Sequence, residues 1–186
     1  MRIAVFIDGG YLEKIIKNEF GEVTIDFSRL VEALVGGREL LRTYYYNCLP
    51  YQSNPPTREE SERFARKERF FSYLRRLPRF SVRLGKLAYR GVGADGQKEF
   101  EQKGIDTLLS IDMVNLAATK QVSNIILLAG DSDYIPAVEV VRTHGVGVIL
   151  YHSQNRRSYH MDLWQVCDER FPIDENLINK IKMSTP

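Results

Sequence analysis

Cysteine and histidine are scarce in this chain, and their scarcity excludes several kinds of site. Among 186 residues there are two cysteines and three histidines. Cys48 and Cys167 lie far apart, which favours neither a zinc site nor a disulfide framework. His144, His152 and His160 are scattered. A reducing cytoplasm fits this cysteine usage.

Long apolar runs are also missing. No stretch approaches the roughly 18–20 apolar residues that span a bilayer. The N-terminal Met-Arg is followed at once by a short β-like run, without the apolar segment or cleavage site of a signal peptide. We therefore expect a cytoplasmic protein with no membrane partner. Its length fits one domain that buries its own core.

Charge is unevenly distributed along the chain. Residues 58–90 contain 11 Lys and Arg against 4 Asp and Glu, a net of +7. The other residues contain 15 against 20, a net of −5, which together gives the overall +2. A basic segment beside an acidic remainder suits a polyanion whose phosphate must approach carboxylates through a metal ion.

Strand-like and helix-like segments alternate along the chain. This alternation predicts an α/β fold, a three-layer α/β/α sandwich with a mainly parallel sheet. The buried apolar runs 2–8 and 124–129 predict central strands. Further strands are expected at 40–48, 80–89 and 146–151, with 98–102 pairing back after a glycine-rich turn at 91–96. Apolar spacing and end signals predict helices at 11–18, 27–35, 58–77, 104–119, 133–144, 159–166 and 175–181. Asp26 and Asp174 are the expected N-caps of the second and the last, and Gly36-Gly37 is expected to end the second.

Two of these predictions concern aromatic side chains. In the basic helix 58–77, Phe64, Phe71 and Leu74 are expected to face the core. The strand 40–48 contains three consecutive tyrosines, 44–46, which are expected to pack in the sheet rather than to stack on bases. That strand is a candidate sheet edge.

Two of the expected strands end at aspartates. The first runs into Asp8-Gly9-Gly10, and the strand 124–129 runs into Gly130-Asp131-Ser132-Asp133. In open α/β folds, ligands bind beyond the carboxyl ends of parallel strands, so these carboxylates are expected to converge. A divalent cation relieves the resulting repulsion, and hard oxygen ligands suit Mg²⁺ or Mn²⁺.

Each aspartate also has a purely structural interpretation. Asp8, Asp106 and Asp133 are candidate helix N-caps, and Asp131 is a candidate for an Asx-type turn. These roles are compatible with metal binding, because a helix N-terminus favours anions. Asp112 lies roughly 120° around its helix from Asp106. A buried carboxylate there needs a partner, for which Lys103 is a candidate unless it faces phosphate.

The order of three motifs resembles a known family. The segments Phe6-Ile7-Asp8-Gly9-Gly10-Tyr11-Leu12, Lys103-Gly104-Ile105-Asp106 and Ala129-Gly130-Asp131-Ser132-Asp133-Tyr134 resemble those of NYN-domain proteins of the LabA-like group, within the PIN-like nuclease superfamily. Asp112-Met113, Gly145-Val146-Gly147-Val148 and the segment Leu163 to Phe171 extend the similarity. The resemblance covers roughly residues 2–172, which we take as the domain, with 173–186 as a C-terminal helix and tail.

This resemblance implies a PIN-like, Rossmann-like fold and an Mg²⁺- or Mn²⁺-dependent ribonuclease. Carried over, the acidic site is Asp8, Asp106, Asp131 and Asp133. The first three would hold metal, and the fourth would orient the nucleophile or bind metal through water. The metal would activate a water molecule and neutralise charge on the scissile phosphate, so no histidine base is needed. Lys103, Asp112 and Ser132 are candidates for supporting these ligands. PIN-like proteins often dimerise, so a homodimer is compatible with the resemblance.

Single-stranded RNA is the expected substrate. Phosphates are expected to contact basic side chains, and unpaired bases to stack on nearby aromatic rings. The alternative for the basic helix is a solvated face with its aromatic residues in the core. The candidate substrate-binding residues are Arg63, Arg66, Lys67, Arg75, Arg76, Asn155 and Arg156, with Arg157 beside them.

Rival functions fit less well. A haloacid-dehalogenase-type phosphatase needs a second aspartate at position 10, which is glycine, and a receiver domain needs an acidic pair after the first strand. A Gly-Asp-Ser esterase would use Ser132 as nucleophile, but the two flanking aspartates disfavour an oxyanion there. The glycine turn at 91–96 opens no helix, so it is no dinucleotide fingerprint. The serious alternative is a non-catalytic metal- or RNA-binding regulatory module.

Overall fold

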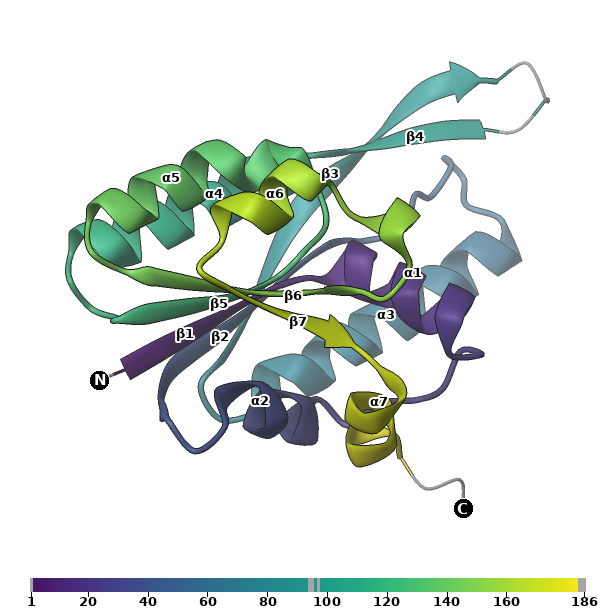
Figure 1. Cartoon of the computed structure of the whole chain (residues 1–186). Helices are drawn as coiled ribbons and strands as arrows, with labels where there is room; N and C mark the ends of the chain where they lie inside the picture. The colour runs from purple at the N-terminus through teal and green to yellow at the C-terminus, as the bar shows by residue number, and fades with distance from the viewer. Residues whose placement is uncertain (1, 94–95, 97, 184–186) are drawn as a thin grey trace.

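A seven-stranded sheet forms the centre of the computed structural model (Figure 1), which describes residues 2–93, 96 and 98–183, with only the backbone of Ala88 and 98–103. The strands lie in the order β4-β3-β2-β1-β5-β6-β7. All neighbours are parallel except β3 and β4, so the sheet has six parallel strands and one antiparallel edge strand. The strands are β1 (Arg2–Asp8), β2 (Glu39–Cys48), β3 (Phe80–Val92), β4 (Lys98–Lys103), β5 (Asn124–Leu128), β6 (Gly147–Ser153) and β7 (Glu169–Ile173).

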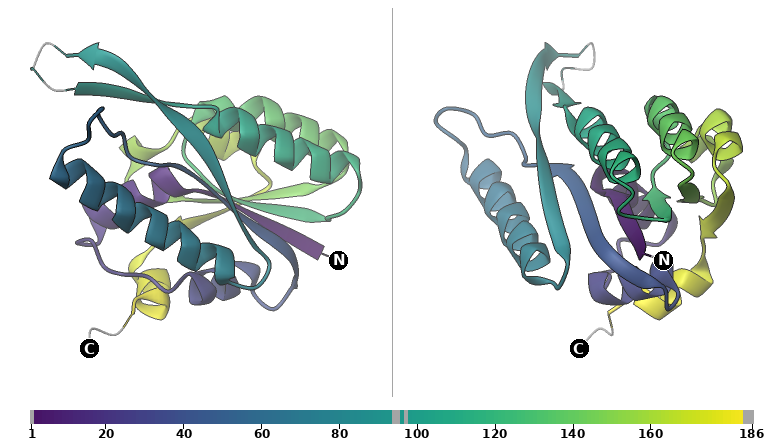
Figure 2. Two further views of the ribbon diagram at one scale, coloured as in Figure 1. Left: turned by 180° about the vertical axis from the view of Figure 1, so that it is seen from behind. Right: turned by 90° about the vertical axis from the view of Figure 1, so that its left-hand side faces the viewer.

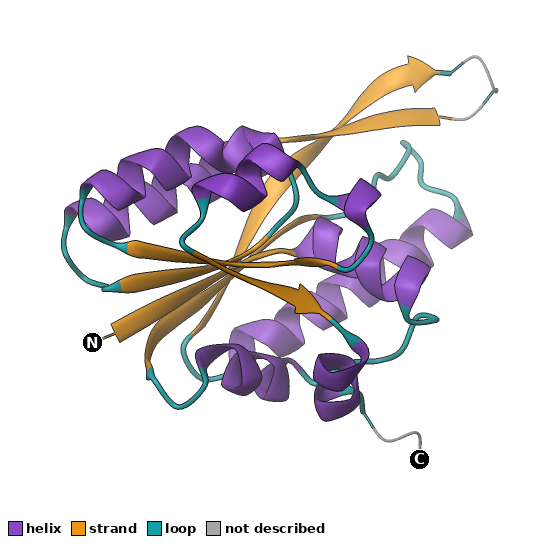
Figure 3. Ribbon diagram, in the orientation of Figure 1, coloured by secondary structure: helices purple, strands orange, loops and turns teal. Residues whose placement is uncertain are grey.

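Helices cover both faces of the sheet (Figures 2 and 3). One layer consists of α1 (Gly9–Glu19), α2 (Phe27–Val35), α3 (Arg58–Arg76) and α7 (Glu175–Ile181). The other consists of α4 (Ile105–Ala118), α5 (Ile135–Thr143) and α6 (Met161–Val166). Two short 3-10 turns, Ser132–Tyr134 and Arg156–Ser158, follow β5 and β6. The predicted three-layer α/β architecture is confirmed.

The two-sided burial of β1 explains its unbroken apolar sequence. Alternate residues point to opposite faces of a strand. Ile3 and Ile7 therefore pack under the α1 and α2 layer, while Ala4 and Phe6 pack under the α4 and α5 layer. Both sets are almost fully buried, as expected for a parallel sheet enclosed by helices.

The predicted N-caps of α2 and α7 are confirmed. Asp26 caps α2 by accepting hydrogen bonds from the backbone N–H groups of Ser28 and Arg29, and Gly36 ends the helix in a left-handed conformation. Asp174 caps α7 in the same way through Leu177. Ile178 and Ile181 of α7 are buried in the core beside α2, so this helix packs with the rest of the fold.

The structure differs from the sequence predictions in three places, two wrong predictions and one strand that was not predicted. Strand β2 is an interior strand between β1 and β3, because the outer position is taken by the β3–β4 hairpin, which extends beyond the body in Figure 1. Strand β7 was not predicted, because its single short run contains Pro172 and has little apolar periodicity. Phe64 is only half-buried, whereas Phe71 and Leu74 of the same helix are fully buried.

Among the described residues, none of the helices has both the length and the apolar composition that a membrane span requires.

Candidate functional site

The acidic residues lie where the strand order of the sheet reverses. From β1 the chain builds one half of the sheet through β2 and β3, and from β5 it builds the other half through β6 and β7. β1 and β5 are neighbours and end at the same edge. This junction is the position at which open α/β sheets bind ligands. Asp8 ends β1 there, and Asp131 follows β5 at the same edge.

One tyrosine hydroxyl connects two carboxylates at this junction. The Tyr134 hydroxyl oxygen lies 2.7 Å from Oδ1 of Asp106 and 3.0 Å from Oδ2 of Asp8. The other oxygen of Asp8, Oδ1, caps α1 by accepting from the backbone N–H of Tyr11 at 3.0 Å. A hydroxyl group has a single proton to donate. The hydroxyl can donate to only one of the two carboxylates at a time. Both contacts are favourable only if a second proton or a cation is bound between Asp8 and Asp106.

Burial explains the electrostatics of this pair. It raises the pKa of Asp8 above the ordinary value, and the nearby Asp106 carboxylate raises it further against the hydrogen bonds from Tyr11 and Tyr134. Burial also raises the pKa of Tyr134 well above that of a free phenol, with Asp8 contributing. Tyr134 thus stays a neutral hydroxyl at neutral pH and remains a hydrogen-bond donor.

The two aspartates after β5 are arranged differently. Asp131 is exposed and caps the 3-10 turn, with Oδ1 accepting from the backbone N–H of Asp133 at 3.0 Å. This is the Asx-type turn that the sequence predicts. Asp133 is exposed within the turn and is not the N-cap that it was predicted to be, and Asp106 is not a cap either, because Gly104 occupies that position. Asp133 and Asp106 line one groove of about 820 Å³ between α4 and α5.

The acidic residues fit a metal ion that takes few protein ligands. Within the described part of the chain, no three His, Cys, Asp or Glu side chains are gathered as a metal-holding group. Asp8 and Asp106 are brought together, and Asp131 is not brought to them as a third ligand. Mg²⁺ is commonly bound through one or two carboxylates, with water and substrate phosphate completing its shell. Burial raises the pKa of Asp8 and the Asp106 carboxylate adds to it, so a cation bound by this pair would favour the charged form of both carboxylates.

Two motif glycines are required by tyrosine rings. A Cβ on Gly9 would overlap the ring of Tyr45, and a Cβ on Gly130 would overlap the ring of Tyr11 and the carbonyl oxygen of Ser158. Both rings therefore reach beneath the turns that present Asp8 and Asp131. This packing is a physical reason for glycine at these two positions of the acidic motifs.

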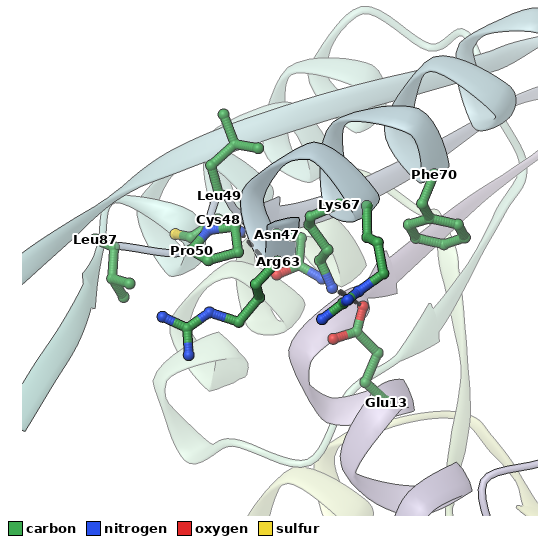
Figure 4. A pocket seen from close by; sticks show the side chains of 10 residues that line it. Glu13, Asn47, Cys48, Leu49, Pro50, Arg63, Lys67, Phe70 and Leu87 are labelled. Atoms are coloured by element: carbon green, nitrogen blue, oxygen red, sulfur yellow. Dashed lines mark hydrogen bonds and ion pairs between the residues drawn. The ribbon is translucent and has the colours of Figure 1, made fainter. Parts of the chain in front are cut away.

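A basic pocket lies at the same edge of the sheet as the acidic pair, and Figure 4 shows the side chains that line it. Its volume is about 540 Å³. The pocket lies at the end of β2, which is Cys48, and at Leu87, just beyond the part of β3 that pairs with β2. Strand β2 is next to β1. Asp8 pairs in register with Tyr46 of β2, two residues before Cys48, so the pocket and the acidic pair adjoin. Burial raises the pKa of the Cys48 thiol, and the carboxylates of Asp106 and Asp8 contribute to the rise. The lining residues are Glu13, Asn47, Cys48, Leu49, Pro50, Arg63, Arg66, Lys67, Phe70 and Leu87.

The predicted substrate-binding residues separate into three groups. Arg63, Arg66 and Lys67 share one face of α3 and line the basic pocket, because residues three and four apart are neighbours on a helix. Arg75 and Arg76 lie in the last turn of α3, about 15 Å from Arg66 along the helix axis. There Arg75 lines a separate cavity with the starts of β2 and β3, so these two are not brought to the acidic pair.

The third group lies beyond the end of β6. The side chain of Asn155 caps the turn Arg156–Ser158 by accepting from the backbone N–H of Arg157 at 3.0 Å. The guanidinium of Arg156 lies 5.0 Å from the centre of the Tyr159 ring. With strands about 4.8 Å apart, the distance across the edge from β2 to β6 is about 14 Å. Basic side chains thus flank the acidic pair on both sides.

The candidate supporting residues also differ in their environment. Asp112 pairs with Arg83 through both carboxylate oxygens, at 2.8 and 3.0 Å, and accepts from the Tyr46 hydroxyl at 2.8 Å. Its partner is therefore an arginine of β3 and not a lysine. Ser132 Oγ lies 3.5 Å from Asp131, too far for a strong hydrogen bond. The side chain of Lys103 lies outside the described part of the chain.

Sequence reasoning missed two residues of this site. Tyr134 stood inside the acidic motif, but its hydroxyl was given no role, although a buried tyrosine usually has a hydrogen-bond partner. Glu13 was missed because it occupies an exposed helix position in α1, where a glutamate is common. Neither has a sequence signal beyond its nearness to the motifs, since their partners come from distant parts of the chain.

Comparison with known proteins identifies the class of this domain. Residues 2–174 match the family model for the NYN domain, which covers nearly the whole chain, so the chain belongs to the NYN-domain family. An uncharacterized protein of Sinorhizobium fredii, y4oD, is 38% identical over 50 residues, 27% of this chain and 23% of that protein. The chain thus matches about a quarter of that relative.

A solved structure shows the same fold. The crystal structure of a protein of unknown function, VPA0982, from Vibrio parahaemolyticus superimposes with a TM-score of 0.68 and 20% identity. The similarity covers 98% of this chain and 96% of that chain. Together with the family match, this likeness supports a PIN-like nuclease fold over the full length.

Proposed function

We propose that this protein is a metal-dependent ribonuclease that hydrolyses phosphodiester bonds of single-stranded RNA in the cytoplasm. One observation carries the proposal. Two carboxylates from separate elements, Asp8 and Asp106, share one hydroxyl at the strand-order reversal, beside a pocket lined by three cationic side chains. The NYN domain supports a nuclease role. Within this proposal we assign the chain to the LabA-like group, because its motifs around Asp8 and Asp131 resemble those of that group.

Asp8 and Asp106 would hold a Mg²⁺ or Mn²⁺ ion. A bound ion of this kind lowers the pKa of a coordinated water and neutralises charge that develops on the phosphate. Tyr134 keeps the two carboxylates at a fixed separation through its hydrogen bonds. Asp131 and Asp133, exposed at the same edge, would act through water or on the nucleophile. Endonucleolytic cleavage fits an edge that is flanked by basic residues on both sides.

Arg63, Arg66 and Lys67 on one side and Asn155 and Arg156 on the other would bind the phosphates of the substrate. Their cationic groups contribute the electrostatic attraction on which single-stranded binding depends. A strand that contacts both groups crosses the acidic pair between them.

Cleavage of labelled single-stranded RNA in Mg²⁺ or Mn²⁺ tests this proposal. We expect cleavage by the wild type, its loss in EDTA, and a reduction of at least a hundredfold in Asp106→Asn. This variant keeps an oxygen for the Tyr134 hydroxyl, and Gly104, not Asp106, caps the helix, so the fold should be unchanged. Asp131→Asn should also abolish cleavage while preserving its capping role, because Asn and Asp cap equally well.

Asp162→Asn, an exposed aspartate in the first turn of α6, is the matched control and should cleave like wild type. Cleavage that survives EDTA, or that is equal in wild type and Asp106→Asn, would rule out this site as the source of activity.

A non-catalytic metal- or RNA-binding module is the second candidate. It is favoured by Asp131, whose carboxylate is engaged with the Asp133 backbone and does not join Asp8 and Asp106. Metal-dependent RNA binding without turnover by the wild type would decide for it.

A further inference from the structure

Glu13 is an unexpected acidic group in a cationic pocket. It projects from α1 toward Lys67 of α3, as Figure 4 shows. One carboxylate oxygen, Oε1, accepts three hydrogen bonds: from the Tyr45 hydroxyl at 2.9 Å, from Asn47 Nδ2 at 2.9 Å and from the Lys67 ammonium. Tyr45 and Asn47 are 0% and 3% exposed, so two of these donors are fixed by the core. The carboxylate is therefore held in one orientation.

The second oxygen of Glu13 remains available. No described residue donates to Oε2, and the side chain is 45% exposed to the pocket. Lys67 uses one of its three N–H groups on Glu13, so further donors remain beside this free acceptor. The pocket thus presents an adjacent acceptor and donor that no protein group satisfies within the described chain.

One other wall of the pocket is cationic, and another is apolar. Arg63 and Arg66 have no hydrogen-bond or ion-pair partner among the described residues, so their guanidinium groups are free to bind phosphate. Leu49, Pro50 and Leu87 form an apolar wall against which a flat ring can lie. Phosphate-binding cations, an apolar wall and a polar pair match the three parts of a nucleotide.

We propose that this pocket binds one unpaired nucleotide of the RNA and selects adenine or cytosine over uracil, with Glu13 as the specificity-determining residue. The inference rests on the proposed function, because it takes RNA as the substrate. Adenine and cytosine present an amino donor next to a ring-nitrogen acceptor, which complements Glu13 Oε2 and Lys67. Carboxylates accept from cytosine N4 in the same manner in other nucleic-acid complexes.

Uracil is the disfavoured base. In the pose that lets cytosine N4 donate to Glu13 Oε2, uracil presents its O4 carbonyl oxygen instead, and this acceptor faces the carboxylate. A base that is already paired in a duplex has no free edge for Glu13 and cannot lie against the apolar wall. The pocket therefore also selects single-stranded over double-stranded RNA.

Titration calorimetry with small probes in EDTA tests this without any turnover. We expect 5′-CMP and 5′-AMP to bind the wild type about tenfold more tightly than 5′-UMP, the size of one discriminating contact. Ribose 5-phosphate, which lacks a base, should bind more weakly than CMP and AMP. In Arg63→Gln the affinity for all four probes should fall together, because this side chain contacts phosphate.

Glu13→Gln tests the specificity directly. The amide oxygen can still accept from Tyr45, Asn47 and Lys67, while the amide nitrogen replaces Oε2 and donates. The preference for CMP over UMP should disappear or reverse in this variant. Glu32→Gln, an exposed glutamate on α2, is the matched control and should keep the wild-type preference.

Equal affinity of the wild type for CMP and UMP would overturn the specificity, and equal affinity for CMP and ribose 5-phosphate would overturn the base pocket itself. Absence of binding by all probes would overturn both. The wild-type comparison needs no variant to fold. A clear preference for CMP in a protein that never cleaves RNA would support this inference while contradicting the nuclease. Metal-dependent cleavage by a protein with no base preference would support the nuclease while contradicting this inference.

Discussion

At the scale of single residues, the central feature of the site is one hydroxyl proton shared among three oxygen atoms, those of Tyr134, Asp8 and Asp106. Tyr134 faces both Asp8 and Asp106 with one hydroxyl proton. Burial penalises the charge on Asp8, and the second carboxylate adds to this penalty. The charged form of Asp8 at neutral pH is therefore less favourable in the folded protein than in the unfolded chain.

Asp8→Asn should stabilise the protein in EDTA by about 1 kcal/mol at pH 7, while it abolishes cleavage. The amide can keep the cap on α1 and donate to Tyr134, which then donates to Asp106. The folded pKa of Asp8 is raised, so its stabilising contribution is present at low pH and is lost as pH rises through that pKa. The difference between variant and wild type should thus shrink from pH 7 to pH 4 in urea unfolding. An Asp8→Asn variant that is less stable than wild type at pH 7 would contradict the claim that the buried charge of Asp8 destabilises the folded protein.

Tyr134→Phe should destabilise the protein by about 1–3 kcal/mol at pH 7, because two half-buried carboxylates lose their shared donor. The loss should be smaller at pH 4, because the raised pKa of Asp8 favours a proton on this carboxyl group, and that proton can replace the hydroxyl donor. Denaturant unfolding at both pH values measures it. Tyr73→Phe is the control, since this half-buried hydroxyl has no hydrogen-bond partner among the described residues, and it should change stability by less than about 0.5 kcal/mol.

At the scale of elements, the turns after β1 and β5 are shaped by tyrosines from elsewhere. Tyr45 of β2 lies against Gly9, and Tyr11 of α1 lies against Gly130. The Tyr11 hydroxyl also accepts from the backbone N–H of Ser153 at the end of β6. Each acidic turn is thus fixed by a ring that belongs to a different element, and the ring requires a glycine.

Gly9→Ala should cost about 1–3 kcal/mol of stability through overlap with the Tyr45 ring. Tyr45→Leu removes that ring, so the alanine should cost much less in the double variant. A double-mutant cycle from urea unfolding would show a coupling of at least about 0.5 kcal/mol. Additive effects of the two substitutions would show that the ring is not what excludes a side chain at position 9.

Sequence patterns and structure agree most closely at the scale of elements. Apolar runs identified β1 and β5 because both faces of these strands are buried, and single capping residues identified α2 and α7. Strand β7 escaped because half-exposed edge strands have no continuous apolar run. The position of β2 escaped because strand order is a property of pairing, which a local pattern does not contain.

At the scale of the whole molecule, the strand order gathers residues by charge along one edge. The acidic pair lies at its centre, the α3 pocket lies on one side, and the turn after β6 lies on the other. Arg75 and Arg76 belong to the same basic segment in sequence but lie at the far end of α3. The basic segment of the sequence is therefore longer than the RNA-binding surface that we propose.

The salt dependence of RNA binding should report this arrangement. Each phosphate contact contributes about −0.7 to the slope of log affinity against log salt for a single strand. Arg63→Gln should make the slope shallower by about 0.7, and Arg63→Gln with Arg66→Gln by about 1.4. Arg76→Gln should leave it nearly unchanged. Binding isotherms of a labelled oligonucleotide between 50 and 300 mM salt measure these slopes, and an equal change for Arg76→Gln would extend the binding surface along α3.

The sequence by itself determined most strands and helices and the caps Asp26 and Asp174, and it placed aspartates at strand ends and helix starts, because these depend on neighbours a few residues apart. The tertiary structure alone decided that Asp8 and Asp106 share the Tyr134 hydroxyl, that Asp131 instead caps its own turn, and that Glu13 is fixed by Tyr45 and Asn47. These contacts join residues up to 126 positions apart. They exist only once β1, β2 and β5 lie side by side, since the sheet and not the local pattern sets which side chains meet.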